Sequence, residues 1–148
     1  MSSEKLEKLE KTIEIDARGP RFSAALTGIV LALALVTGWV WVATFQAVVF
    51  AIGAIKGPQF TPYAFIFRTL IKPRLKSPVR TEDVRPPQFA QSIGLLFALV
   101  ALAGAATGTS VVFTIAVAAA LAAAFLNAAF DFCLGCQIYL ILFRIRNA

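Results

Sequence analysis

The sequence predicts an all-α integral membrane protein, a four-helix bundle built from two transmembrane hairpins. Apolar residues make up 59% of its 148 residues, the mean hydropathy is +0.79, and two long stretches, 22–55 and 86–130, contain no charge. Soluble globular domains are about half apolar and about a quarter charged, whereas charged residues are only 15% of this chain. The lipid bilayer is therefore the expected surroundings of the apolar helices.

The first uncharged stretch, residues 22–55, is too long for one straight crossing. As a helix it would extend roughly 51 Å, whereas the hydrocarbon core is about 30 Å thick. Thr37 and Gly38 lie near its middle and precede Trp39 and Trp41, and tryptophan is typical of membrane interfaces. A helical hairpin is predicted here, and a single tilted helix with an embedded tail is the alternative.

The second hairpin is predicted over residues 88–131. The two residues before it are prolines, which are tolerated at the start of a helix. Its turn lies within residues 104–110 and separates helices over about 88–106 and 110–130. Small residues recur four apart in two sets: Gly104 with Gly108, and Ala116 with Ala120 and Ala124. This spacing favours close contacts between helices. The alternative is that the glycines only form the turn and the alanines only fill space in the helix.

The charged residues define the orientation. All 14 basic residues lie in an N-terminal segment (1–21), a Pro-rich loop (56–87) and the C-terminal tail (132–148), and neither hairpin turn carries a charge. Because basic loops stay inside, we expect a multi-pass protein of the bacterial inner membrane with both termini cytoplasmic. Five acidic residues in segment 1–21 favour a retained membrane anchor over a cleaved signal. Acid-before-base pairs four apart and a thin apolar edge predict a short amphipathic helix in the same segment.

Two apolar segments outside the hairpins are too short to cross a membrane. Residues 63–71 lie between prolines and are followed by basic residues, which predicts an interfacial segment on the membrane surface. A docking surface for a soluble partner is the alternative. Residues 138–143 precede Arg144 and Arg146 and are also expected at the interface.

Composition excludes several functions. The chain has no histidine, which removes Ser-His and Cys-His nucleophile pairs and the commonest transition-metal ligand. We expect no cofactor and no resident metal, because two cysteines are too few for a structural zinc site within one chain. The net charge of +6 is explained by membrane orientation, so no nucleic-acid partner is expected. The expected partners are the lipid bilayer and a second copy of the chain.

The only two cysteines, Cys133 and Cys136, form a C-x-x-C motif. Such a pair suits reversible disulfide chemistry, because one thiolate can attack a mixed disulfide formed on the other cysteine. A c-type haem site would need histidine after the second cysteine, where Gln137 stands. Cysteines that are merely small buried apolar residues are the alternative. In the cytoplasm the resting form is expected to be the dithiol.

Several residues are expected to support this pair. Asn127 and Asp131 lie one helical turn apart and would join the two thiols in a polar cluster at the cytoplasmic mouth of the bundle. Asp131 is expected to pair with Arg68 or Arg85, or to sit at the interface; shuttling a proton to a thiol is the alternative. Gly135 is expected to loosen the helix, so that the two cysteines reach disulfide distance.

Four motifs in order resemble a bacterial membrane family catalogued as domain of unknown function 4395. They are IDARGPRF (15–22), the loop segment 57–68, DVRPPQFAQ (83–91) and FCLGC (132–136), and the resemblance covers about residues 13–144. The family has no established activity. Its members are often encoded near thioredoxin-like proteins and thiosulfate sulfurtransferases, which implies a partner of that kind. The family commonly has a small residue where Asp131 stands and an acidic one at Gln137, so it implies no catalytic role for Asp131.

The predicted function is exchange of electrons or sulfur between the catalytic pair Cys133 and Cys136 and a soluble thiol protein, on the cytoplasmic side. One alternative is a transport or channel component for a small sulfur-containing anion, attracted by Arg68, Arg85 and the basic loop. A structural membrane subunit without chemistry is another.

Overall fold

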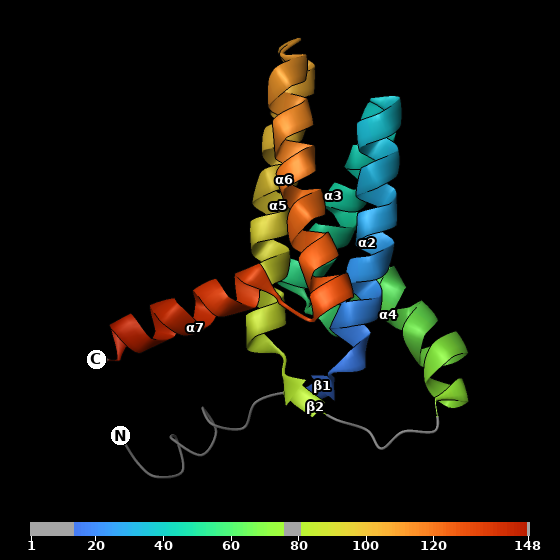
Figure 1. The fold of residues 1–148 in the computed structure, drawn as a ribbon, viewed down its shortest axis with the longest axis vertical. Coiled ribbons are helices and arrows are strands. Elements are labelled where there is room, and N and C mark those ends of the chain that lie inside the picture. The colour runs from blue at the N-terminus through green and yellow to red at the C-terminus, as the bar shows by residue number, and fades with distance from the viewer. Residues whose placement is uncertain (1–13, 76–80, 148) are drawn as a thin grey trace.

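The computed structural model describes residues 14–75 and 81–147 (Figure 1). Its body consists of four helices: α2 (Arg18–Thr37), α3 (Val40–Ile55), α5 (Arg85–Ala106) and α6 (Ser110–Phe130). Helix α2 packs against α6, α3 packs against α5, and α5 also packs against α6. The all-α prediction is confirmed. The expected amphipathic helix over residues 1–13 lies outside the described residues.

The outer surface of the bundle is apolar. Large hydrophobic side chains are exposed along the helices, with Val36 86% and Trp41 84% accessible. Three helices, α2, α5 and α6, are long and apolar enough to cross a membrane. Helix α3 has 16 residues and is shorter, at about 24 Å. These features indicate a membrane protein.

Glycines form the two turns at the far end of the bundle. Gly38, after α2, has a φ of +67°, and Gly108, after α5, has a φ of +77°, a conformation that glycine adopts without strain. Residues 22–55 therefore form a helical hairpin rather than one tilted helix. Gly104 has another role: a Cβ there would lie 2.9 Å from the backbone nitrogen of Phe113, so its absence lets α5 approach α6. Three alanines of α6 predicted to pack closely are buried: Ala116, Ala120 and Ala124.

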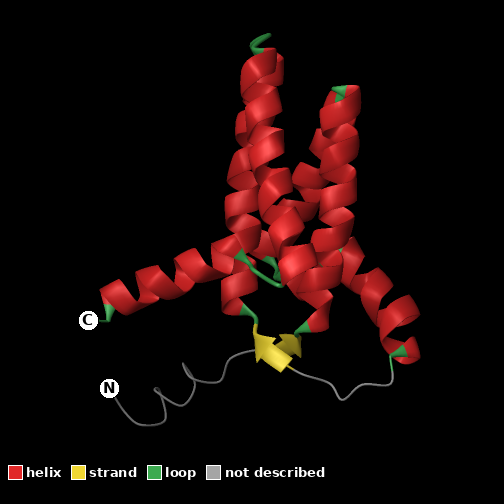
Figure 2. Ribbon diagram, viewed as in Figure 1, coloured by secondary structure: helices red, strands yellow, loops and turns green. Residues whose placement is uncertain are grey.

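A two-stranded sheet closes the other end, the base of the bundle (Figure 2). Strand β1 (Glu14–Asp16) pairs antiparallel with β2 (Thr81–Asp83), with Ile15 opposite Glu82. The sequence does not predict this sheet, because three-residue polar strands show no alternation of apolar residues. Helices α2 and α5 start directly after the strands, before the expected starts at residues 22 and 88.

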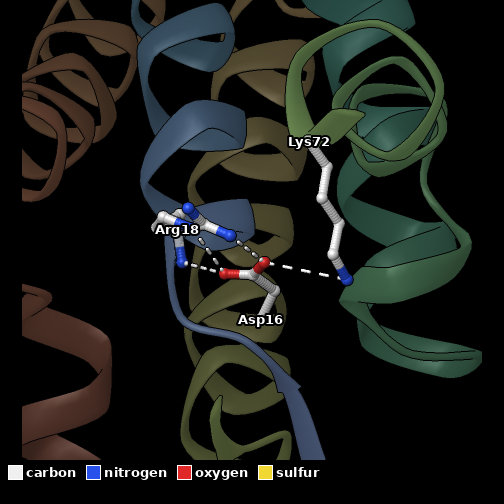
Figure 3. Close-up of polar contacts among 3 residues, drawn as sticks. All are labelled: Asp16, Arg18 and Lys72. Atoms are coloured by element: carbon white, nitrogen blue, oxygen red, sulfur yellow. Dashed lines mark hydrogen bonds and ion pairs between the residues drawn. The ribbon is translucent and has the colours of Figure 1, made fainter. Parts of the chain in front are cut away.

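Each of these early helix starts is built on an Asp-x-Arg sequence. The Asp16 carboxylate accepts the backbone N–H of Arg18 at 3.0 Å and pairs with its guanidinium at 2.9 Å, while Lys72 Nζ lies 3.8 Å away (Figure 3). The Asp83 carboxylate binds Arg85 in the same way, at 3.0 and 2.9 Å. These carboxylates satisfy backbone N–H groups that a helix start leaves open. The hydrogen bond from Arg18 holds the pKa of Asp16 below its ordinary value.

The two halves of the chain repeat the same order of elements. Each half has a short strand, an Asp-x-Arg helix start, a helical hairpin and then the sequence Tyr-x-x-x-Phe-Arg, at residues 63–68 and 139–144. The first copy lies in a helical segment that follows the 3-10 turn η1 (Pro58–Phe60): α4 (Pro62–Ile66), the π-helical η2 (Phe67–Ile71) and the 3-10 turn η3 (Lys72–Arg74). The second copy lies in α7 (Leu134–Arg146). The two segments leave the base on opposite sides (Figure 1). The contact of α2 with α6 corresponds to that of α5 with α3, and β1 pairs antiparallel with β2, so the halves are related by an approximate twofold axis.

The segment of the first half is anchored by a buried tyrosine. Tyr63 Oη donates to Gln46 Oε1 at 2.7 Å, and Gln46 Nε2 reaches Thr27 Oγ1 at 3.4 Å. Gln46 is completely buried in α3. Burial also raises the pKa of Tyr63 to about 12. The expected interfacial segment 63–71 is thus partly enclosed, with Tyr63 and Phe67 inside the protein.

Removing that hydroxyl, as in Tyr63→Phe, is expected to lower the free energy of unfolding by about 1–3 kcal/mol, because a buried amide oxygen loses its partner. Thermal unfolding of the purified protein in detergent measures this loss. The matched control is Tyr139→Phe, since the Tyr139 hydroxyl has no hydrogen bond within residues 14–75 and 81–147. Equal losses in both variants would contradict the role given to the Gln46 contact.

Candidate functional site

The C-x-x-C motif lies where the chain passes from α6 to α7. Helix α6 ends at Phe130, and Asp131 follows with a φ of 53°. Cys133 is the N-cap of α7 in an extended conformation, and Cys136 lies in the first turn of that helix. The two cysteines form a disulfide, with Cα atoms 5.1 Å apart. The expectation of a helix loosened around the motif is wrong, because the chain leaves the helical conformation before Cys133.

The start of α7 provides a favourable environment for sulfur at Cys133. The backbone N–H of Cys136 points to Cys133 Sγ at 3.1 Å. Unpaired N–H groups give a helix N-terminus a partial positive charge. A sulfur held at this position has its thiolate form stabilised after reduction. We therefore expect Cys133 to be the better nucleophile of the pair.

Gly135 has a packing role that the sequence does not reveal. A Cβ placed on it would lie 2.6 Å from both Cα and Cβ of Ala90 in α5. Glycine is thus required so that the first turn of α7 can lie directly on α5. The expected role of loosening the helix is replaced by this close contact.

A cavity of about 600 Å³ adjoins the disulfide, between α2, α5, α6 and α7. The predicted site residues on its wall are Asn127, Asp131, Cys133, Gly135 and Cys136. The structure therefore brings together the polar residues that were expected to cluster with the cysteines.

The two arginines expected beside Asp131 are engaged elsewhere. Arg68 donates to the carbonyl oxygen of Gln59, and Arg85 is paired with Asp83. Neither of them lines the cavity. Asp131 is exposed and makes no ion pair with any residue of the described ranges. The predicted pairing with Arg68 or Arg85 is wrong, and the position of Asp131 fits the alternative of an exposed helix end.

Two further cavity residues were not predicted. The Arg21 side chain, from α2, donates to the carbonyl oxygens of Ala128 at 3.0 Å and Ala129 at 3.4 Å, at the end of α6. A cation suits the partial negative charge of a helix C-terminus. Gln91 of α5 lines the cavity with its Oε1 buried and without a hydrogen-bond partner. No sequence signal identifies either residue, because both roles depend on which helices pack together.

The described residues contain no group of three or more metal-ligating side chains. The disulfide is thus the chemically distinctive group of this cavity.

Neither the curated proteins nor the solved structures that were searched gave a match. The family model described as Domain of unknown function (DUF4395) matches residues 15–144, which include both Asp-x-Arg helix starts and the C-x-x-C motif. The chain therefore belongs to the DUF4395 family.

Proposed function

We propose that this is a membrane thiol-disulfide exchange protein, whose Cys133–Cys136 pair exchanges electrons with a soluble thiol protein. The observation that carries the proposal is the position of the motif: Cys133 caps a helix N-terminus, and its sulfur faces the N–H of Cys136. A helix N-terminus favours the thiolate form of a cysteine, and the second sulfur is close enough to complete the exchange.

The exchange is a two-electron reaction. In the reduced protein the Cys133 thiolate attacks a disulfide of the partner, which forms a mixed disulfide and releases one partner thiolate. Cys136, as its thiolate, then attacks Cys133 Sγ and releases the second partner thiolate. The partner is reduced to a dithiol, and the Cys133–Cys136 disulfide is formed. The reverse sequence reduces the chain and oxidises the partner.

Alkylation with a mass-tagged thiol reagent tests the proposal. In isolated membranes, treatment with a mild reductant is expected to give two tags per chain, and treatment with a mild oxidant none. Cys133→Ser and Cys136→Ser each provide a one-tag reference that oxidation leaves unchanged. Two tags after oxidation, or no tags after reduction in detergent, would show that the cysteines are not a reversible pair.

The proposed membrane arrangement places α2, α3, α5 and α6 across the bilayer as two hairpins. The charged residues among the described ranges lie at the base of the bundle. They belong to the two strands, the helix ends next to them, α7 and the segment of α4, η2 and η3. The turns around Gly38 and Gly108 carry none. By the positive-inside rule, the base, both termini and the C-x-x-C motif face the cytoplasm of a bacterial cell. The short helix α3 is accommodated by local thinning of the bilayer, or by placing its tryptophan-containing start at the membrane interface.

Labelling of single cysteines checks this arrangement. In a chain without the native cysteines, Thr109→Cys in the second turn is expected to react with a membrane-impermeant reagent added to intact cells. Thr81→Cys in β2 is expected to react only after the membrane is opened. Both positions are exposed in the structure, so accessibility to solvent does not distinguish them. Labelling of Thr81→Cys from outside would overturn the orientation.

The soluble partner we propose is a thioredoxin-like protein or a sulfurtransferase, both of which present a reactive cysteine. Association of this chain with a second copy stays a prediction. Passage of a sulfur-containing anion stays the alternative. In the described ranges Arg68 and Arg85 have other partners, and the cavity beside the disulfide carries Arg21 as well as Glu82, Asp83 and Asp131 on its wall.

A further inference from the structure

We propose that the cavity beside the disulfide binds a lipid-soluble quinone, which accepts electrons from the Cys133–Cys136 dithiol. This inference rests on the proposed thiol-disulfide function and names its second electron partner. A soluble protein reaches the motif from the water, whereas a quinone reaches it through the membrane.

The shape of the cavity supports an elongated, apolar ligand. Its wall follows α6 from Asn127 to Ala119, a length of about 12 Å along the helix, and continues past the end of α6 to Asp131 and the cysteines. Charged residues lie only at the base, and the deeper wall is built from alanines of α6 together with Phe50 and Phe97. An apolar tail is stabilised in such a channel, and a small anion is not.

The cavity also reaches the outer surface of the bundle. Phe97 of α5 and Ile138 of α7 line the cavity and are at the same time exposed large hydrophobic side chains. These exposed surfaces belong to the apolar exterior that the proposed arrangement places against lipid. A membrane-dissolved molecule therefore has a route to the cavity without crossing the charged base.

Gln91 provides the polar contact that a quinone ring needs. Its Oε1 is buried without a partner, although buried amide oxygens are normally hydrogen-bonded. Its side chain lies against Gly53 of α3, and Gln91 lines the same cavity as both cysteines. An amide suits both redox states: Nε2–H donates to a quinone carbonyl, and Oε1 accepts from the hydroxyl of the hydroquinone.

The reaction balances without a further reactant. The dithiol loses two electrons and two protons as the bond between Cys133 Sγ and Cys136 Sγ forms. The quinone takes up both electrons and both protons, and its two carbonyl groups become hydroxyl groups. The resulting disulfide is then available to oxidise the soluble thiol partner, which returns the pair to the dithiol.

The test uses the full chain in lipid nanodiscs, reduced and freed of reductant, with decylubiquinone as the probe. The ring carbons of this quinone all carry substituents, which prevents addition of a thiol to the ring. One hydroquinone is expected to form for each pair of thiols lost. Cys133→Ser is expected to form none. Gln91→Leu should slow the reaction about tenfold, the effect of losing one hydrogen bond.

A cavity-filling pair of variants separates binding from folding. Ala123→Phe places a ring in the cavity, whereas Ala122→Phe adds the same ring at an exposed neighbour outside it. Ala123→Phe is expected to abolish quinone reduction and keep exchange with glutathione disulfide, and Ala122→Phe to keep both. If the wild-type dithiol reacts with glutathione disulfide but not with quinone, or if both phenylalanine variants reduce quinone equally, the cavity does not bind quinone. If the dithiol reacts with neither oxidant, the thiol-disulfide function itself is wrong.

Discussion

Replacing Cys136 by serine is expected to trap the protein in a mixed disulfide with the proposed soluble partner. In the proposed exchange Cys133, at the N-cap of α7, attacks, and Cys136 resolves the intermediate. Without Cys136 the forward step that releases the partner as a dithiol is lost, and the mixed disulfide breaks only when the released partner thiolate reverses the first step. Non-reducing electrophoresis of membranes should show a larger species that a reductant converts back, and mass spectrometry of this species identifies the partner.

The matched control for the trap is Cys133→Ser. It removes the nucleophile and leaves a thiol inside the first turn of α7, so exchange is expected to be lost with no trapped species. Both variants keep the volume of the side chain nearly unchanged, and both should unfold near the wild-type temperature. The opposite pattern, in which Cys133→Ser traps the partner and Cys136→Ser does not, would assign the attack to Cys136.

Gly135→Ala is expected to be the most damaging single methyl addition at the site. The new Cβ would lie 2.6 Å from Cα of Ala90, which belongs to the backbone of α5 and cannot turn aside. Overpacking of this kind costs about 1–3 kcal/mol. Helix α7 must therefore shift away from α5 and take the cysteines with it. Thermal unfolding reports the loss of stability, and hydrogen exchange of the α7 amides reports the loosened contact.

The control for this substitution is Gly28→Ala in α2. A Cβ at Gly28 would lie 3.9 Å from a methyl group of Leu121, an ordinary contact. In a helix interior this change stabilises by about 0.5–1 kcal/mol, because alanine loses less backbone freedom on folding. If Gly135→Ala is tolerated as well as Gly28→Ala, α7 does not depend on close contact with α5.

The sequence predicts those features that depend on local chemistry. Charge-free stretches interrupted by Gly38 and by residues 104–110 predicted both helical hairpins, and the two turns occur there. The sequence also grouped Asn127 and Asp131 with the cysteines, because residues near one another in the chain stay close across a single break.

Features that depend on which helices meet were not predictable in this way. Arg21 reaches the end of α6, more than a hundred positions along the chain, only because α2 packs on α6. The role of Gly135 depends on its contact with α5, and the sheet depends on the pairing of two three-residue strands. The expectation for Asp131 also failed. Its charge was expected to need a cation, but Asp131 lies exposed after the end of α6.

The twofold relation between the halves has a consequence for how the molecule could be built. In a homodimer of one half, the same strand from each copy would pair across the axis, as β1 and β2 do here, and every surface would occur twice. Joining the halves in one polypeptide removes that constraint, since a residue can change on one side alone. The two halves do differ in this way: cysteines precede Tyr139 in the second half, whereas Gly57-Pro58-Gln59-Phe60 precedes Tyr63 in the first. Under the proposed exchange, the half with the buried Tyr63 anchors its segment, and the half with the cysteines carries the reaction.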